Sequence, residues 1–243
     1  NLFLNADTIA LNTNSRLQST GALSVRPING TTTVGNSGVE GTLNLPAAYF
    51  STNFVDGFSS VTIGSATAGN ITVGGNTTFN DSARLWTSGN IVLDGDLNAA
   101  GQNLTLTGAG TVNGSGVITA AGLLLNGAGA YTLSADNDVN TLAASTLSSL
   151  TFFDNDDLAI GSDGGVNGIN ATGLLNIATG SGDLTISQTV STSSTSSSAV
   201  ILNAGEDAAA GTAAGGNVVI TGSGSVSTGA GGRATIYTGS VSG

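Results

Sequence analysis

The chain has 243 residues and a net charge of −11, with 15 Asp and Glu but only four Arg as cations. This balance excludes nucleic-acid binding through a basic surface, because binding phosphates requires clustered cations. The lack of Cys excludes disulfide bonds and thiolate metal sites, and no apolar run approaches the roughly 18 residues of a membrane span.

The first distinctive element in chain order is an aromatic stretch at residues 45–58. Pro46 suits the first turn of a helix and Gly57 suits its end. The stretch holds four of the ten Tyr and Phe residues of the chain, Tyr49, Phe50, Phe54 and Phe58. We expect a short helical or aromatic insertion here, at the side of the main fold.

From residue 69 onward a short phrase recurs, in which Gly-Asn precedes an apolar–any–apolar triplet. It occurs at residues 69–73, 89–93 and 216–220, with near-copies at 102–106 and 182–186. Each copy predicts a very short strand with two inward side chains, and the middle residue is often Thr, which suits a solvated face. Such a strand buries too little to be stable alone, so it must stack on its own copies. Asn before the strand can bond backbone groups that the bend leaves free.

This repeat predicts an all-β fold, a parallel β-helix in which each coil stacks on the next. At about 19 residues per coil the chain makes roughly 12 or 13 coils, and we expect one continuous segment over residues 1–243. Because the chain has no Met, we expect it to be a fragment of a longer protein. An array of antiparallel sandwich strands is the alternative. It is disfavoured because the runs that flank each Asn-Gly are short and aromatic residues make up only 5% of the chain.

Acidic residues are densest at residues 152–158, with a second group at 136–140. Calcium takes six to eight oxygen ligands, often from carboxylates at alternating positions. Neither stretch completes a calcium loop, because Leu158 and Leu147 stand where ligands belong. A solvated turn is the favoured interpretation and we expect no cofactor. The weak calcium candidates are Asp154, Asp156, Asp157, Asp136 and Asp138.

Catalysis is not expected. Neighbouring carboxylates act as acid and base in β-helical glycosidases, but those enzymes also position sugars with His, Lys and Arg. This chain has no His or Lys, and no Arg between Arg84 and Arg233. The many Ser residues likewise lack a base that could activate them.

A Ser/Thr-rich run at residues 187–198 is predicted to be an exposed loop between coils. Thr-rich β-helical faces also occur in ice-binding proteins, which need regularly spaced Thr-x-Thr. Here that pattern is isolated, at residues 31–33 and 105–107.

Several stretches resemble the repeat region of filamentous-haemagglutinin-like giant adhesins. They include residues 56–64 (Asp-Gly-Phe-Ser-Ser-Val-Thr-Ile-Gly), the Gly-Asn phrases at 69–73 and 89–93, and the tail at 231–237 (Gly-Gly-Arg-Ala-Thr-Ile-Tyr). The resemblance covers about three-quarters of the chain, from about Leu43 onward.

The resemblance implies a right-handed β-helix that is exported, often by two-partner secretion through an outer-membrane transporter. The implied role is the structural shaft of a surface adhesin or extracellular fibre, found outside the cell or on its surface. Its partners would be a cell-surface or glycan receptor, or further copies of itself in a fibre. The Asn-Pro-Asn motif of the family's secretion module is not found around Pro27 or Pro46. A β-helical carbohydrate-active enzyme and an ice-binding protein are the alternatives.

Overall fold

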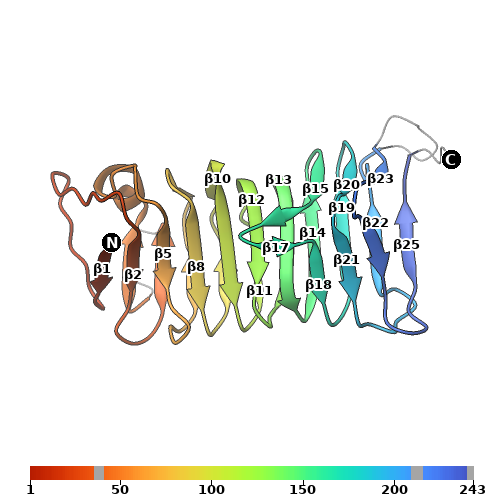
Figure 1. Ribbon diagram of the computed structural model, residues 1–243. Helices are drawn as coiled ribbons and strands as arrows, with labels where there is room; N and C mark the ends of the chain where they lie inside the picture. Colours follow the sequence, from red (N-terminus) through yellow and green to blue (C-terminus); the bar gives the residue numbers. More distant parts are fainter. Residues whose placement is uncertain (36–40, 209–215, 240–243) are drawn as a thin grey trace. The chain divides into compact units, whose positions relative to one another are not determined.

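The computed structural model describes residues 1–35, 41–208 and 216–239. The chain divides into two compact units, Asn1–Ala121 and Gly122–Gly243, here called unit 1 and unit 2. Each unit is a stack of coils whose short strands pair in parallel with those of the neighbouring coils (Figure 1). The predicted all-β parallel solenoid is confirmed. Its right-handed sense and its continuity over residues 1–243 stay predictions.

Most strands have only two to five residues, because the chain turns a corner after each. Those of unit 1 are β1 (Leu2–Asn5), β2 (Leu23–Arg26), β3 (Thr32–Gly35), β4 (Leu43–Pro46), β5 (Val61–Gly64), β6 (Ile71–Val73), β7 (Thr77–Thr78), β8 (Ala83–Thr87), β9 (Ile91–Leu93), β10 (Leu97–Gly108) and β11 (Val112–Gly114), and β12 (Ile118–Asn126) continues into unit 2. Those of unit 2 are β13 (Ala130–Leu147), β14 (Ser149–Asp154), β15 (Leu158–Ile160), β16 (Ser162–Asp163), β17 (Val166–Asn167), β18 (Ile169–Ala171), β19 (Leu175–Thr179), β20 (Leu184–Ile186), β21 (Thr189–Thr192), β22 (Val200–Asn203), β23 (Val218–Ile220), β24 (Ser225–Ser227) and β25 (Ala234–Tyr237).

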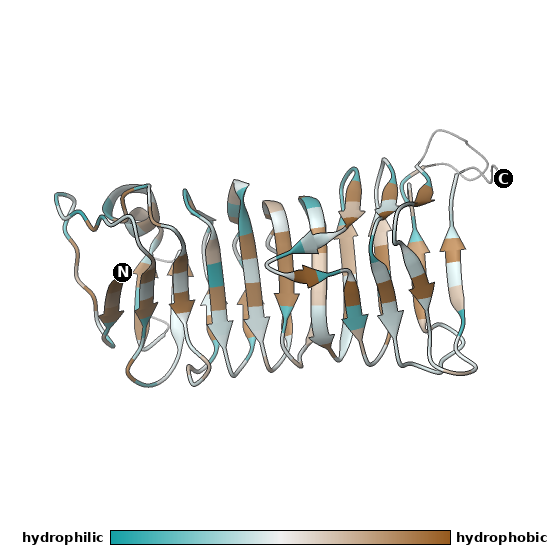
Figure 2. Ribbon diagram, viewed as in Figure 1, coloured by the Kyte–Doolittle hydropathy of each residue, from teal (hydrophilic) through white to brown (hydrophobic). Residues whose placement is uncertain are grey.

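In unit 1, inward aliphatic residues stack on aliphatic residues of the next coil. One row joins β5, β8 and β10 through Val61, Ala83 and Leu104, and another joins β6, β9 and β11 through Ile71, Ile91 and Val112. These side chains are buried, and brown apolar bands recur on strand after strand (Figure 2). Since a strand of three residues has only two inward side chains, its apolar surface is covered chiefly by the coils on either side.

In unit 2, three parallel rows of strands surround the interior. The rows are β14–β19–β22–β25, β15–β20–β23 and β18–β21–β24. The long strand β13 bends around corners and pairs with the first strand of all three rows. Thr146 lies at one of its bends, with φ at 65°.

The described part of the chain forms about nine turns, fewer than the roughly 12 or 13 predicted. One reason is that the coils are longer than expected. Leu150 and its register partner Leu175 are 25 residues apart, and Leu184 and Val218 are 34 apart. The other reason is that one coil has strands on more than one side, and their sequences look alike, so one coil can be counted as two. Leu158 in β15 and Leu175 in β19, for example, belong to different rows of strands.

The aromatic stretch at residues 45–58 contains one helical turn, η1 (Tyr49–Asn53). Phe50 packs edge-to-face against Phe54 and Phe79, with ring centroids 5.3 and 5.1 Å away. That the stretch is an insertion stays a prediction. The described residues contain no helix that is long and apolar enough to cross a membrane.

The Ser/Thr-rich run at residues 187–198 is partly strand. β21 occupies its first half, where Val190 and Thr192 are buried, whereas the residues after Thr192 lie outside strands and are mostly exposed. Val190 pairs in register with Ile169 and so continues the row of β18. Register with a buried neighbour therefore overrides a composition that is typical of a loop.

A hairpin interrupts one coil of unit 2. β16 and β17 pair antiparallel, and the N–H of Gly168 closes the hairpin by a 2.8 Å bond to the carbonyl oxygen of Gly161. Gly164, between the two strands, lies against the side chain of Leu124 on β12. In a strand, neighbouring side chains point to opposite faces, yet residues 123–125 are all buried. The hairpin explains this, because it helps to cover the side chain of Leu124.

Gly114 should not tolerate a side chain. Its φ is 141°, and a Cβ there would collide with the carbonyl oxygen of Leu93 in the neighbouring coil. We expect Gly114→Ala to lower the free energy of unfolding by about 3 kcal/mol, as measured by urea denaturation. Gly101→Ala is the matched control, because Gly101 has a φ of 75° but no atom near such a Cβ. Gly101→Ala should lower the free energy of unfolding by only about 1–2 kcal/mol. Equal losses in the two variants would show that the contact with the Leu93 carbonyl does not matter.

Candidate functional site

A row of Asp and Asn side chains lies along one corner of unit 2, directly before β15, β20 and β23. The first residues of these strands are in register. Oδ1 of Asp157 accepts a 2.6 Å hydrogen bond from the backbone N–H of Asp183. Oδ1 of Asp183 in turn accepts a 2.8 Å bond from the N–H of Asn217. Each side chain thus supplies an acceptor to the backbone of the next coil.

Unit 1 repeats this arrangement, with Asn in its first row. Oδ1 of Asn70 accepts from the N–H of Asn90, and Oδ1 of Asn90 accepts from the N–H of Thr111, both at 2.9 Å. A second row begins with Asn76, whose Oδ1 accepts from the N–H of Asp96 at 3.1 Å. We call these rows the Asx ladders. They confirm that the residue before a strand bonds a backbone group left free at the bend.

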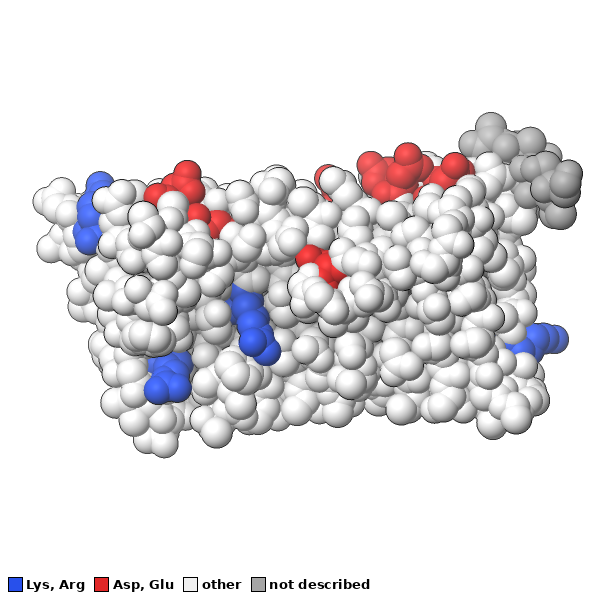
Figure 3. Space-filling view, in the orientation of Figure 1, with Lys and Arg blue, Asp and Glu red and all other residues white. Residues whose placement is uncertain are grey.

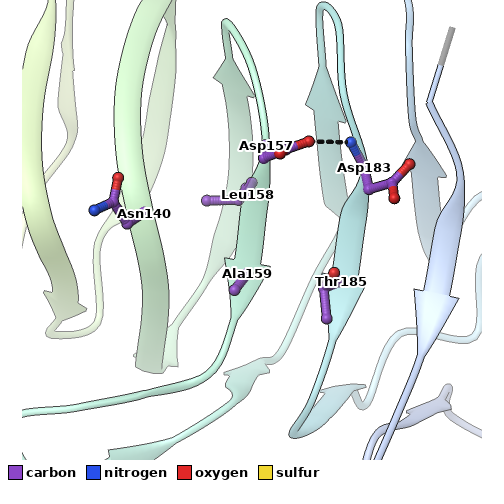
Figure 4. Close-up of a pocket in the computed structure, with 6 residues that line it drawn as sticks. All are labelled: Asn140, Asp157, Leu158, Ala159, Asp183 and Thr185. Carbon is purple, nitrogen blue, oxygen red and sulfur yellow. Dashed lines mark hydrogen bonds between the residues drawn. The ribbon is translucent and has the colours of Figure 1, made fainter.

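A shallow groove of about 300 Å³ lies beside the Asx ladder of unit 2 (Figure 4). It is lined by Asn140, Asp157, Leu158, Ala159, Asp183 and Thr185. Figure 4 shows the Asp157 carboxylate pointing along the stack toward the backbone nitrogen of Asp183. Acidic side chains gather on this edge of unit 2 (Figure 3). Unit 2 as a whole has nine Asp and Glu residues but one Arg.

The five calcium candidates lie in different environments. Asp154 is 0% exposed, whereas the others, Asp136, Asp138, Asp156 and Asp157, are exposed. In residues 1–35, 41–208 and 216–239, no group of three or more Asp, Glu, His or Cys is placed to hold a metal ion. The candidates are therefore not gathered into one ligand set, and calcium binding stays a hypothesis.

Asp154 is the residue whose electrostatics depart most clearly from those of a free side chain. Desolvation by burial raises its pKa to about 8, although backbone hydrogen bonds from Val139 and Asp156 act in the opposite direction. The nearby carboxylates of Asp156 and Asp138 raise the pKa further, by like-charge repulsion. At neutral pH most molecules therefore carry Asp154 as the neutral acid.

Comparison with known proteins identifies no relative. A scan against models of protein families, a search of curated proteins and a search of solved structures each gave no match.

Asp183 lies in the ladder because it occupies the Asn position in the near-copy of the repeated phrase at residues 182–186. Another contact was not predicted from the sequence. Arg84 and Trp86 form a cation–π pair on β8, 4.1 Å from guanidinium carbon to ring centroid, and Arg84 Nε donates to Thr107 Oγ1 at 3.2 Å. Residues two apart on a strand share a face, so their spacing could have indicated this pair.

The described site is suited to holding coils together. In the ladder of unit 2, one oxygen each of Asp157 and Asp183 is engaged by a backbone N–H of the next coil. The arrangement satisfies backbone donors at a corner and concentrates negative charge there.

The ladder predicts a specific stability effect in unit 1. Asn90→Ala removes the acceptor of the Thr111 N–H, and we expect it to lower the free energy of unfolding by about 1–2 kcal/mol in urea denaturation. Asn90→Asp keeps an acceptor oxygen and should recover most of the loss. Asn113, exposed on β11, is the control, and Asn113→Ala should stay within about 0.5 kcal/mol of the parent. Equal effects of the two Ala variants would contradict the ladder.

In unit 2 the same position should show charge repulsion. Asp157 and Asp183 precede strands that are about 4.8 Å apart and bear like charges. We expect Asp183→Asn, which keeps the acceptor for Asn217, to stabilise the protein by about 0.5 kcal/mol at low ionic strength. The gain should vanish in about 1 M salt, where screening is nearly complete. Thermal melts at both salt concentrations test this, and a gain that is independent of salt would exclude repulsion as its cause.

Proposed function

We propose that the chain is part of the structural shaft of a secreted bacterial surface adhesin or extracellular fibre. The observation that carries the proposal is the double connection between successive coils. Backbone ladders join the strands in register, and the Asx ladders join the corners between those strands. A coil held at its strands and at a corner resists sliding and swivelling against its neighbour, which is the property that a shaft needs.

The second support is that each coil depends on its neighbours rather than on a central core. Ile71, Ile91 and Val112 stack through successive coils of unit 1, and each is 0% exposed. Stability is then the sum of nearest-neighbour interfaces, so coils can be added without redesigning the rest. This suits a protein whose role is reach and not the enclosure of a substrate.

The partners in this proposal follow from the resemblance to filamentous-haemagglutinin-like adhesins. They are an outer-membrane transporter during export, and then a cell-surface or glycan receptor, or further copies in a fibre. The ice-binding alternative is less well supported. One outward row of unit 2 contains Thr132, Thr151 and Thr235 but is broken by Asn176 and Ile201, and ice-binding faces need regular Thr arrays.

Surface labelling of the bacterium that carries the gene tests the proposal. We expect an antibody against this chain to label intact cells as strongly as permeabilised ones, because a shaft projects outside the outer membrane. We also expect deletion of the gene to reduce attachment to host cells or abiotic surfaces, or cell–cell aggregation. An antibody against a periplasmic protein is the control, and should label permeabilised cells only. Labelling of this chain that requires permeabilisation would overturn the proposal.

A further inference from the structure

Asp154 occupies a position where a charged group is out of place. It is the last residue of β14 and lies inside unit 2, 0% exposed, although the next three residues are exposed. Its register partners are Asn137 on β13 and Thr179 on β19, which are also buried and carry no charge. Three coils thus meet around this carboxyl group.

Asp154 has fewer hydrogen-bond donors around it than a buried carboxylate needs. The carboxyl group accepts backbone hydrogen bonds from Val139, at 3.0 Å to Oδ2, and from Asp156, whereas Oδ1 is buried and has no hydrogen-bond partner. An ionised carboxylate needs donors at both oxygens, and burying one without them is strongly unfavourable. Arg233 is the one cation in the sequence of unit 2, and it is exposed directly before β25.

The charged groups that face Asp154 also oppose its ionisation. They are Asp138, on the β13 segment that packs against β14, and Asp156, in the turn that follows Asp154. Thr179 on the other side is uncharged, and its hydroxyl is engaged by the carbonyl oxygen of Gly182 and the N–H of Gly205. Loss of the proton would therefore place a third negative charge beside two others with no compensating cation.

We propose that Asp154 is a proton-operated latch in unit 2, which closes the corner between β13, β14 and β19 when it is protonated and loosens that corner when it ionises. The corner depends on bonds around this residue. The N–H of Gly180 donates to the carbonyl oxygen of Asp154 at 2.7 Å, and the N–H of Asn155 donates to that of Asn137 at 2.7 Å. Hydration of an ionised Asp154 draws this segment outward and breaks these bonds first. This inference does not rest on the proposed function.

The direction of the pH effect follows from linkage. Burial raises the pKa of Asp154 from 3.8 to about 8 in the folded state, so the folded protein holds a proton that the unfolded chain has released. Stability is therefore greatest below the unfolded pKa and falls as pH rises, until it levels off above about 8. In that window the equilibrium constant for opening increases about tenfold per pH unit.

Few other side chains are expected to titrate in this pH range, because the chain has no His and no Cys. The other groups with altered titration are few. Burial also raises the pKa of Asp81 in unit 1 and of Asp163 on β16. A comparison of variants is therefore needed to assign the slope to Asp154.

The experiment measures urea denaturation at pH 5.5, 7 and 8.5, together with hydrogen exchange of peptides that span β13 and β14. We expect the unfolding equilibrium constant of the parent to rise about a hundredfold or more from pH 5.5 to 8.5. Exchange protection of the β13–β14 peptides, corrected for the intrinsic rate, should fall over the same range. Asp154→Asn mimics the neutral acid, so its stability should be nearly independent of pH and should exceed that of the parent at pH 8.5.

Asp156→Asn is the matched control, because it removes a neighbouring exposed carboxylate and should keep most of the pH dependence. Asp163→Asn, a second buried carboxyl in the same unit, should also keep it. If the stability of the parent protein does not change between pH 5.5 and 8.5, the proposal is overturned. This outcome can be measured even if none of the variants folds. A slope that persists in Asp154→Asn would overturn it as well.

Discussion

Register between coils is the constraint on which both units depend. A strand such as β9 has two inward side chains, Ile91 and Leu93, and neither could be buried by its own coil. Burial comes from the same positions one coil away, where β6 offers Ile71 and Val73. A slip of one residue would turn both aliphatic side chains toward water. The strands can therefore be short, because specificity comes from repetition and not from length.

The Asx ladders solve the complementary problem at the bends, where backbone donors lose their strand partners. Asn and Asp serve equally well as acceptors, so Asn90 in unit 1 and Asp183 in unit 2 perform the same structural task. Their electrostatic consequences differ, because Asp accumulates charge along the stack. Unit 2 combines this charged exterior with a carboxyl group in its interior, at Asp154.

Much of the fold could be predicted because the repeated phrase marks the residues whose side chains point into the coil. Gly-Asn followed by an alternating triplet located β6, β9 and β23, and the near-copy with Asp183 in place of Asn located β20. The number of turns could not be predicted, because the corners vary in length while the strands do not, as the 34 residues from Leu184 to Val218 show. The burial of Asp154 was not predicted from the sequence, for a different reason. Alternation from Leu150 through Phe152 places it inward, but its residue type and its acidic neighbours are typical of a solvated turn.

The hairpin of β16 and β17 shows what this construction permits. It leaves one coil and returns, and the strands before and after it, β15 and β18, still pair with β20 and β21 in register. Insertions at corners are thus decoupled from the aliphatic interior. A solenoid of this construction can therefore accept an inserted loop at a corner without a change in the register of its interior strands.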